Sequence, residues 1–410
     1  MDLVAGNLYW TSLTKIPNKY TYVGDDMECD VVIIGGGITG AICGYFFAES
    51  GIDTILVEKN IIGYGSTSAS TSILQYEIDR NMSGLKNQIG MENAVKAFRL
   101  CEKAVYDIEK MIRRIGDQCG FRLCESLYFT SSENEAKFLR QEYELRKENG
   151  FNVEFLDEKE GKERYSLPIK AGIYSKSGVG EIDPYRFSHG LLSSASQKGL
   201  KIFENTEIIN MEPQGNTIVL TTNNHFRIKA KKAIIASGFE SRTFIKKKVT
   251  TLTRTFTIVT KPVKHFDGWY RKSIIRNHKN PYTYLRTTMD NRIIIGGEDI
   301  PLGGQRSKMA HLTNDAPAAQ QKYEILMNRL REWFPQIGDI QEAYKFSGIF
   351  GGSKDSLPYI GEYEELPNCY FCLGYGSNGI LYAVMGAQIL RELYLDHYSL
   401  DAHLFSFYRK

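Results

Sequence analysis

The stretch Asp30-Val-Val-Ile-Ile-Gly-Gly-Gly-Ile-Thr-Gly40 decides the fold of this chain of 410 residues. An apolar run of the kind found in buried strands breaks at Gly35, and glycines at Gly37 and Gly40 complete the spacing G-x-G-x-x-G. A helical pattern over 41–50 follows directly. The first glycine permits a tight turn, the second lets a pyrophosphate approach the backbone, and the third lets the helix pack on the strand.

An acidic residue closes this unit. A second apolar run over 54–57 ends at Glu58, so strand, turn, helix, strand and acid follow one another as they do in dinucleotide-binding proteins. We expect phosphates to lie at the helix N-terminus, beside Ile38 and Thr39, where free N–H groups and the helix dipole favour negative charge. Glu58 is expected to accept hydrogen bonds from ribose hydroxyls, and Lys59 beside it is a further binding candidate.

A loop rich in hydroxyl groups comes next, over 63–72, and runs straight into the apolar pair Ile73 and Leu74, unlike a flexible linker. Its hydroxyls and free backbone N–H groups can wrap a pyrophosphate and reach toward an isoalloxazine ring. This favours FAD over a nicotinamide dinucleotide. The binding candidates in the loop are Gly65, Ser66, Thr67, Ser70, Thr71 and Ser72.

Composition narrows the class of protein. The 51 Lys and Arg residues nearly balance the 48 Asp and Glu residues, which argues against a strongly basic nucleic-acid binder. No apolar run approaches the roughly 20 residues that cross a bilayer, and the N-terminus lacks a secretory pattern, so we expect a cytoplasmic protein. Seven cysteines argue against a disulfide framework, and Cys369 and Cys372 are interpreted as strand thiols. No metal site is expected.

A second glycine turn lies near the C-terminus, at Gly374-Tyr-Gly-Ser-Asn-Gly379, and a helical pattern over 380–394 follows it. No second strand with a ribose-binding acid comes after that helix, so the turn does not predict a second dinucleotide site. A helix N-terminus entered through glycines is still an anion site. We expect it to face the N1–C2=O edge of a flavin, with the candidates Gly376, Ser377, Asn378, Gly379 and Ile380.

With these motifs, the chain resembles the FAD-dependent D-amino-acid oxidase/glycine oxidase/sarcosine oxidase superfamily over about 30–395. The markers are 30–40, Glu58, 65–72, 180–184, 236–238, 292–297, 354–361 and 374–380. The resemblance implies a Rossmann-like α/β domain with a parallel sheet that binds FAD, and an α+β substrate domain with a large antiparallel sheet. It also implies that Ile208 lies beside the adenine and that Ala236, Ser237 and Gly238 run near the cofactor.

The resemblance further implies how the chain is divided. The FAD-binding domain is expected to be discontinuous, built from 1–90, 165–245 and 345–410. The substrate domain is expected to comprise 91–164 and 246–344.

Departures from the superfamily concern the substrate. Relatives hold a substrate carboxylate with arginines at positions where this chain has Phe350, Ser377 and Gln75. A bidentate guanidinium clamp cannot be replaced by these side chains. We therefore expect simple α-amino acids to bind poorly and a larger or carboxylate-free amine to bind better. The segment 348–354 has no cysteine, which predicts noncovalent FAD.

Other pocket candidates follow from position. Gln75, Tyr76 and Glu77 come after the hydroxyl loop, and Glu77 either attracts a substrate ammonium or is a structural acid. Tyr282 and Tyr284 alternate along one strand and should share a face, lining the pocket or packing in the sheet. Arg286 either supplies the missing clamp or forms a structural ion pair.

The leading hypothesis is an FAD-dependent oxidoreductase that oxidises a small amine or amino-acid-like substrate by hydride transfer to flavin N5. One alternative is a 2-hydroxy-acid dehydrogenase that passes electrons to a protein or quinone acceptor. Another is a noncatalytic FAD-bound subunit. The sequence leaves the substrate, the electron acceptor and the oligomeric state open.

Overall fold

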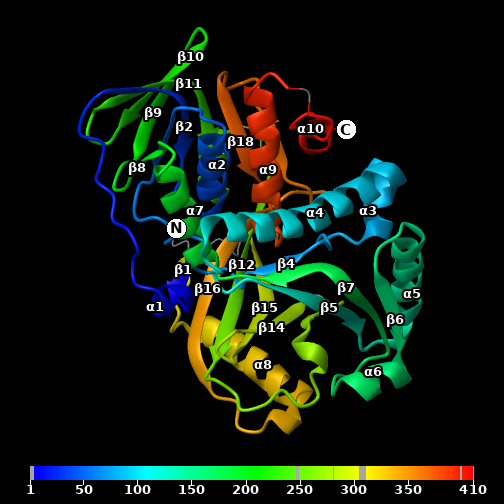
Figure 1. Cartoon of the computed structure of the whole chain (residues 1–410). Helices are drawn as coiled ribbons and strands as arrows, with labels where there is room; N and C mark the ends of the chain where they lie inside the picture. Colours follow the sequence, from blue (N-terminus) through cyan, green and yellow to red (C-terminus); the bar gives the residue numbers. More distant parts are fainter. Residues whose placement is uncertain are drawn as a thin grey trace.

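Two β-sheets meet across the middle of the molecule, with helices on their outer faces (Figure 1). This computed structural model describes residues 4–245, 247, 249–279, 281–303, 311–397 and 399–409. The mixture of parallel and antiparallel sheets is the α/β architecture expected from the sequence.

The first sheet has eight strands in the described part of the chain, ordered β17-β18-β11-β2-β3-β8, with β10 and β9 continuing from β11. The strands from β18 to β8 are parallel, and their apolar runs are buried on both faces, as parallel strands covered by helices require. The bounds are β2 (Met27–Ile34), β3 (Thr54–Val57), β8 (Lys201–Phe203), β9 (Ile208–Gln214), β10 (Thr217–Thr222), β11 (Arg227–Ile235), β17 (Tyr359–Glu362) and β18 (Cys369–Leu373).

Helices α2 (Ile38–Glu49), α7 (Pro184–Ser196) and α9 (Gly379–Tyr394) pack on one another against this sheet. Pro184 at the first helical position and the Asp183 carboxylate, which accepts hydrogen bonds from two backbone N–H groups, start α7. The long amphipathic helix α4 (Met91–Ile115) lies across α9 and α7 and has the bounds that its apolar spacing predicts.

The second sheet has ten strands in the described part, ordered β1-β16-β12-β15-β14-β13-β5-β7-β4, with β6 beside β7. Its pairs are antiparallel except β13 with β5. The bounds are β1 (Val4–Gly6), β4 (Ile73–Gln75), β5 (Arg122–Thr130), β6 (Val153–Asp157), β7 (Ala171–Glu181), β12 (Thr251–Thr260), β13 (Ile274–Asn277), β14 (Thr283–Thr287), β15 (Ile293–Leu302) and β16 (Glu342–Gly352).

Helix α8 (Pro317–Trp333) covers the outer face of this sheet and closes a separate apolar core around Leu326 and Trp333. The remaining helices are short or peripheral: α1 (Trp10–Leu13), α3 (Met82–Ile89), α5 (Glu133–Glu148), α6 (Glu158–Arg164) and α10 (Ala402–Phe405). No helix in the described residues is both long enough and apolar enough to cross a membrane.

Several local expectations differ from the structure. In the sequence, the run 226–230 has the pattern of the second strand of a hairpin and the run 232–236 that of a buried strand. The two runs form the single strand β11, whose first half pairs with β10 and whose second half pairs with β18. The sequence pattern predicts a helix over 326–333, and α8 starts earlier, at Pro317. The strands β1, β4 and β7 lie in the ten-stranded sheet although their residues fall in segments assigned to the FAD-binding domain. The exact domain boundaries stay a prediction.

Candidate active site

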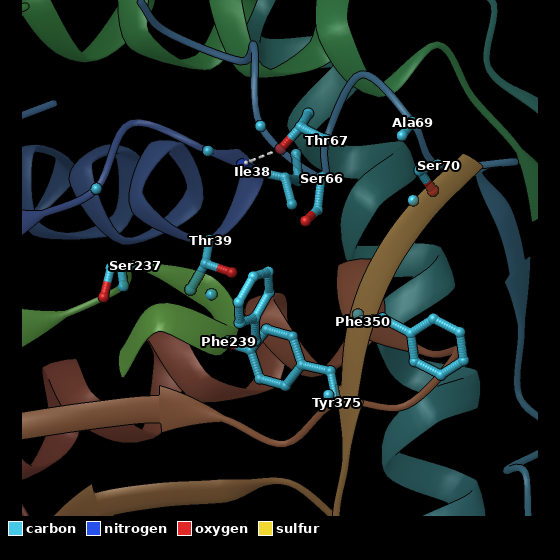
Figure 2. Close-up of a pocket in the computed structure, with 18 of the residues that line it drawn as sticks. Ile38, Thr39, Ser66, Thr67, Ala69, Ser70, Ser237, Phe239, Phe350 and Tyr375 are labelled. Carbon is cyan, nitrogen blue, oxygen red and sulfur yellow. Dashed lines mark hydrogen bonds between the residues drawn. The ribbon is translucent and has the colours of Figure 1, made fainter. Parts of the chain in front are cut away.

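A cavity of about 490 Å³ lies where the two sheets meet. Its wall is built from five stretches of the chain that are distant in sequence: the glycine turn with the hydroxyl loop, the end of β11, the strands around β14, the inner part of β16, and the turn before α9. Figure 2 shows Ile38, Thr67, Ser237, Phe350 and Tyr375, which line the cavity from four of these stretches. The volume is in the range of small-molecule and cofactor sites.

The glycine turn has no room for a side chain at Gly35 or Gly40. Gly35 has φ +114°, and a Cβ there would lie 2.6 Å from the carbonyl oxygen of Ala236. A Cβ on Gly40 would lie 1.8 Å from the carbonyl oxygen of Gly35, so Gly40 is needed for helix packing and does not line the cavity. Gly37, by contrast, faces mostly open space, which leaves the start of α2 accessible to an anion.

Glu58 lies at the end of β3 and lines the cavity. Its two carboxylate oxygens accept hydrogen bonds from the backbone N–H groups of Gly36 (2.7 Å) and Asn60 (2.8 Å). Burial raises the pKa of this carboxyl above its usual value, and the two N–H donors oppose that shift. Each carboxylate oxygen keeps a second acceptor position, so the side chain can still accept from a ribose.

Two hydrogen bonds hold the hydroxyl loop, one to the start of α2 and one to α1. The Thr67 hydroxyl accepts from the N–H of Ile38 at 2.9 Å, as Figure 2 shows. The indole N–H of Trp10 in α1 donates to the carbonyl of Ser70 at 2.7 Å. The N-terminal segment therefore braces a loop that the sequence singled out for the cofactor.

Most of the predicted cofactor residues line this one cavity. They are Gly35, Gly37, Ile38, Thr39, Glu58, Lys59, Gly65, Ser66, Thr67, Ser70, Thr71, Ser72, Ile208, Ala236, Ser237, Gly238, Gly376, Ser377, Asn378, Gly379 and Ile380.

The turn before α9 differs in one detail from the expected anion site. The backbone N–H of Ser377 donates to the Asp79 carboxylate at 3.0 Å, and the Ser377 hydroxyl also bonds that carboxylate. Gly376 has φ +57°, and a Cβ there would meet the same carboxylate at 2.4 Å. The Ser377 donor is therefore used within the protein, while the following N–H groups at the start of α9 have no intrahelical acceptor.

Two tyrosines from the region of β14 line the same cavity. Tyr282 and Tyr284 line the cavity with ring centroids 5.7 Å apart, on one face of the strand as expected. The ring of Tyr284 lies across Gly296, where a Cβ would come within 2.4 Å of it, and its hydroxyl is 3.0 Å from that of Thr255. Burial raises the pKa of both phenols, so they stay protonated at neutral pH.

Three pocket candidates lie elsewhere. Arg286 is buried, 3.5 Å from the Glu181 carboxylate, and does not line the cavity, so it forms the structural ion pair and not the clamp. Glu77 is 2% exposed and pairs with Arg146 at 3.3 Å, which excludes it as the group that attracts an ammonium. Tyr76 packs in the same buried cluster, with its hydroxyl on Ser175.

Gln75 and Phe350 do line the cavity, and so does Arg276, which the sequence reasoning missed. Arg276 follows two isoleucines in β13, so the signal was a charged residue inside an apolar strand. A charge at such a position is rarely fully buried unless it has a partner.

The family assignment follows from comparison with known proteins. A model described as FAD dependent oxidoreductase matches residues 30–393. The chain belongs to this family. The glycine oxidase of Bacillus subtilis (strain 168) is 24% identical over 378 residues, 90% of this chain and 93% of that protein. The gamma-glutamylputrescine oxidoreductase of Escherichia coli (strain K12) is 21% identical over 388 residues, 92% of this chain and 86% of that protein.

A solved structure agrees with this family. The crystal structure of glycine oxidase from Geobacillus kaustophilus superposes with a TM-score of 0.78 at 22% identity, covering 94% of this chain and 99% of that one. The predicted superfamily is thereby confirmed, and the protein is an FAD-dependent oxidoreductase. The alternative of a noncatalytic subunit is set aside.

The residues present fit FAD. The open glycine turn, the Glu58 carboxylate and the hydroxyl loop provide an N–H-rich wall for a pyrophosphate and an acceptor for a ribose. The two tyrosines line the same cavity, so the cradle and the tyrosines border one continuous space.

Proposed function

We propose that the protein oxidises a C–N bond of a small amine or amino-acid-like substrate, using noncovalent FAD. The observation that carries this proposal is the single cavity that is lined by both the dinucleotide cradle and the tyrosines Tyr282 and Tyr284. Two relatives that cover most of this chain are named glycine oxidase and gamma-glutamylputrescine oxidoreductase, and both named compounds carry an amine. FAD, when bound, supplies a hydride acceptor at flavin N5.

The chain's own part in this reaction is binding and orientation. The carboxylates that line the described cavity, Glu58, Glu207 and Glu240, belong to the nucleotide end, and no histidine or cysteine lines it. The phenols of Tyr282 and Tyr284 are protonated at neutral pH, so they can donate hydrogen bonds but are poor bases. We infer that the substrate amine must arrive neutral. The absence of cysteine and histidine in the described wall also supports noncovalent FAD.

The test is anaerobic mixing of the FAD-loaded protein with a panel of simple amines, α-amino acids of both hands, N-methyl amino acids and 2-hydroxy acids. We expect at least one amine or amino acid to bleach the flavin absorbance. The rate should rise with pH through the pKa of the substrate amine, because the pocket offers no base to remove that proton.

Two other outcomes would change the proposal. Bleaching by 2-hydroxy acids but by no amine would replace it with the hydroxy-acid dehydrogenase. Readmitting oxygen to the bleached protein, with and without a quinone, then separates an oxidase from a dehydrogenase that uses another acceptor.

A further inference from the structure

Asp79 places a negative charge against the turn before α9. Its carboxylate accepts a hydrogen bond from the backbone N–H of Ser377 at 3.0 Å and another from the Ser377 hydroxyl. Within the residues that the structure describes, no cationic side chain forms an ion pair with this carboxylate. The neighbouring Arg80 donates instead to the carbonyl of Lys354 at 3.1 Å. The charge of Asp79 is therefore solvated by two donors but is not neutralised.

The position of Asp79 is fixed by contacts on either side of it. The Asn378 side chain is buried, and its amide donates to the carbonyls of Gln75 at 3.3 Å and Glu77 at 3.0 Å. These bonds hold the segment after β4 against the start of α9. Asp79 then lies over Gly376, where the lack of a side chain allows the carboxylate to approach the turn.

The charge of Asp79 acts on the active-site cavity. Gly376, Ser377 and Asn378, which form the turn beneath it, line that cavity. Burial raises the pKa of the Tyr282 phenol well above its usual value, and the Asp79 carboxylate adds to that shift. Tyr282 lines the same cavity. A second negative charge beside this turn would therefore be repelled by Asp79.

Reduced FAD carries a charge of this kind. Two electrons and one proton convert FAD to an anion whose negative charge lies at the N1–C2=O edge of the flavin, the edge that the turn before α9 is expected to face. The start of α9 favours this charge, because its first N–H groups have no intrahelical acceptor. Asp79 opposes it, because like charges repel and a cavity wall screens them less than bulk water does.

We propose that Asp79 offsets the positive end of α9 and thereby makes the bound FAD harder to reduce. Asp79 acts through its charge on the turn and is not a catalytic residue. A flavin of lower potential is a weaker oxidant of the substrate and, once reduced, a stronger reductant of its electron acceptor. The inference rests on the proposed function only in that both require FAD in this cavity.

The test measures the flavin itself rather than turnover. The FAD-loaded protein is reduced stepwise with dithionite beside a reference dye, which gives the two-electron potential. Sulfite is titrated separately, because it adds to flavin N5 and leaves negative charge at the N1–C2=O edge. Asp79→Asn keeps the shape of the side chain and an acceptor for Ser377 but removes the charge.

We expect Asp79→Asn to bind sulfite about tenfold to a hundredfold more tightly than the wild type, because a repulsive charge is lost. The potential should rise by about 30–60 mV, since each tenfold change in a two-electron equilibrium corresponds to about 30 mV. Asp79→Glu keeps the charge, so both values should stay close to those of the wild type.

Asp157→Asn is the matched control. Asp157 also accepts a backbone N–H at the start of a helix, that of Glu160 in α6 at 2.8 Å, but it lies outside the cavity. This variant should leave the potential and the sulfite affinity unchanged, although it too removes a carboxylate from a helix start.

Unchanged potential and sulfite affinity in Asp79→Asn would overturn the proposal and make Asp79 a residue that only supports the turn. If Asp79→Asn does not retain FAD, Asp79→Ser, which also removes the charge, must show the rise in its place. Loss of FAD from both variants would overturn the proposal equally, because the carboxylate would then be needed to hold the site together.

The two measurements use no substrate, so they are independent of the proposed reaction. A higher potential in Asp79→Asn would support the role of Asp79 even if no amine bleached the flavin. Conversely, bleaching by an amine together with an unchanged potential in Asp79→Asn would leave the proposed function standing and remove the role of Asp79.

Discussion

At the scale of single residues, Glu58 contacts the glycine turn and lies where the ribose is expected to bind. Its carboxylate already accepts from Gly36 and Asn60, so Glu58→Ala removes these contacts as well as those to a nucleotide. We predict that Glu58→Ala weakens FAD binding by about 1.5–3 kcal/mol for each charge-assisted hydrogen bond lost. Titrating FAD into the apoprotein measures this.

The control for Glu58 is Glu28→Ala, which removes an exposed carboxylate of β2 paired only with Lys229. Its FAD affinity should match the wild type. An unchanged affinity in Glu58→Ala would show that the acid at the end of β3 does not hold the nucleotide.

Asp299 is a second residue whose surroundings make a measurable prediction. Burial raises the pKa of its carboxyl to about 7; Asp79 and Glu298 add to this shift, whereas the Thr255 hydroxyl and Lys322 oppose it. The folded protein therefore holds this proton more tightly than the unfolded chain does. Stability should fall as pH rises from about 4 to about 7, and the loss should persist above that range.

Asp299→Asn removes this titration. We predict that the variant gains about 1–3 kcal/mol over the wild type at pH 8 and little at pH 4. Urea unfolding at a series of pH values measures the difference. Asp267→Asn, at an exposed aspartate, should follow the wild-type profile. A constant difference between Asp299→Asn and the wild type across pH would contradict the assignment.

The sequence predicts the role of a single residue when that role depends on neighbours close along the chain. The glycine turn and Glu58 are fixed by spacing along about thirty residues, and the structure places them around one cavity. Arg276 and Arg286 could not be distinguished in this way. Both follow apolar or aromatic residues in strands, and only the pairing of distant strands gives Arg286 the Glu181 partner and leaves Arg276 in the cavity.

At the scale of elements, the N-terminal segment forms an arm at the edge of the ten-stranded sheet. Strand β1 pairs with β16, and Trp10 of α1 is 3% exposed, with its indole N–H on Ser70 and the Arg286 guanidinium 5.1 Å from its ring. This arm thus connects the hydroxyl loop to the ten-stranded sheet.

We predict that Trp10→Ala lowers the free energy of unfolding by about 3–5 kcal/mol, because it leaves a large cavity and removes a buried hydrogen bond. It should also weaken FAD binding, since the loop at Ser70 loses its brace. Urea unfolding and FAD titration measure the two effects. Tyr22→Ala, at a residue 55% exposed, should change neither. Full stability in Trp10→Ala would mean that the arm does not brace the loop.

Elements with a strong pattern of their own were predictable. The bounds of β3 and α4 agree with their apolar runs and spacing. The arm was not, because Val4–Gly6 is too short to carry a pattern and forms a strand only beside β16. The sequence pattern divides β11 into two strands for a related reason. Its charged first half has the pattern of a hairpin strand, and its apolar second half has the pattern of a buried strand.

At the scale of the whole molecule, the cavity lies between two sheets that share one apolar core, while α8 closes a second core on the ten-stranded sheet. The eight-stranded sheet supplies the glycine turn and the end of β11, while the ten-stranded sheet supplies Tyr284 and Phe350. A ligand that fills the cavity therefore contacts both sheets. Because FAD should bind the folded protein and not the unfolded chain, it should stabilise both halves together.

We predict that FAD at a thousandfold excess over its dissociation constant raises the free energy of unfolding by about 4 kcal/mol. Tryptophan fluorescence distinguishes stabilisation of the whole molecule by FAD from stabilisation of the residues around the cavity alone. Trp269 and Trp333 lie in the core under α8, on the far side of the ten-stranded sheet from the glycine turn. Trp10, the third tryptophan, contacts the hydroxyl loop, so the measurement uses the Trp10→Phe variant. In that variant tryptophan fluorescence should report unfolding of the α8 core, while flavin fluorescence reports release of FAD. With FAD present, the two transitions should coincide at a higher urea concentration than the tryptophan transition of the apoprotein. A tryptophan transition that does not move with FAD would show that the cofactor stabilises only the eight-stranded half.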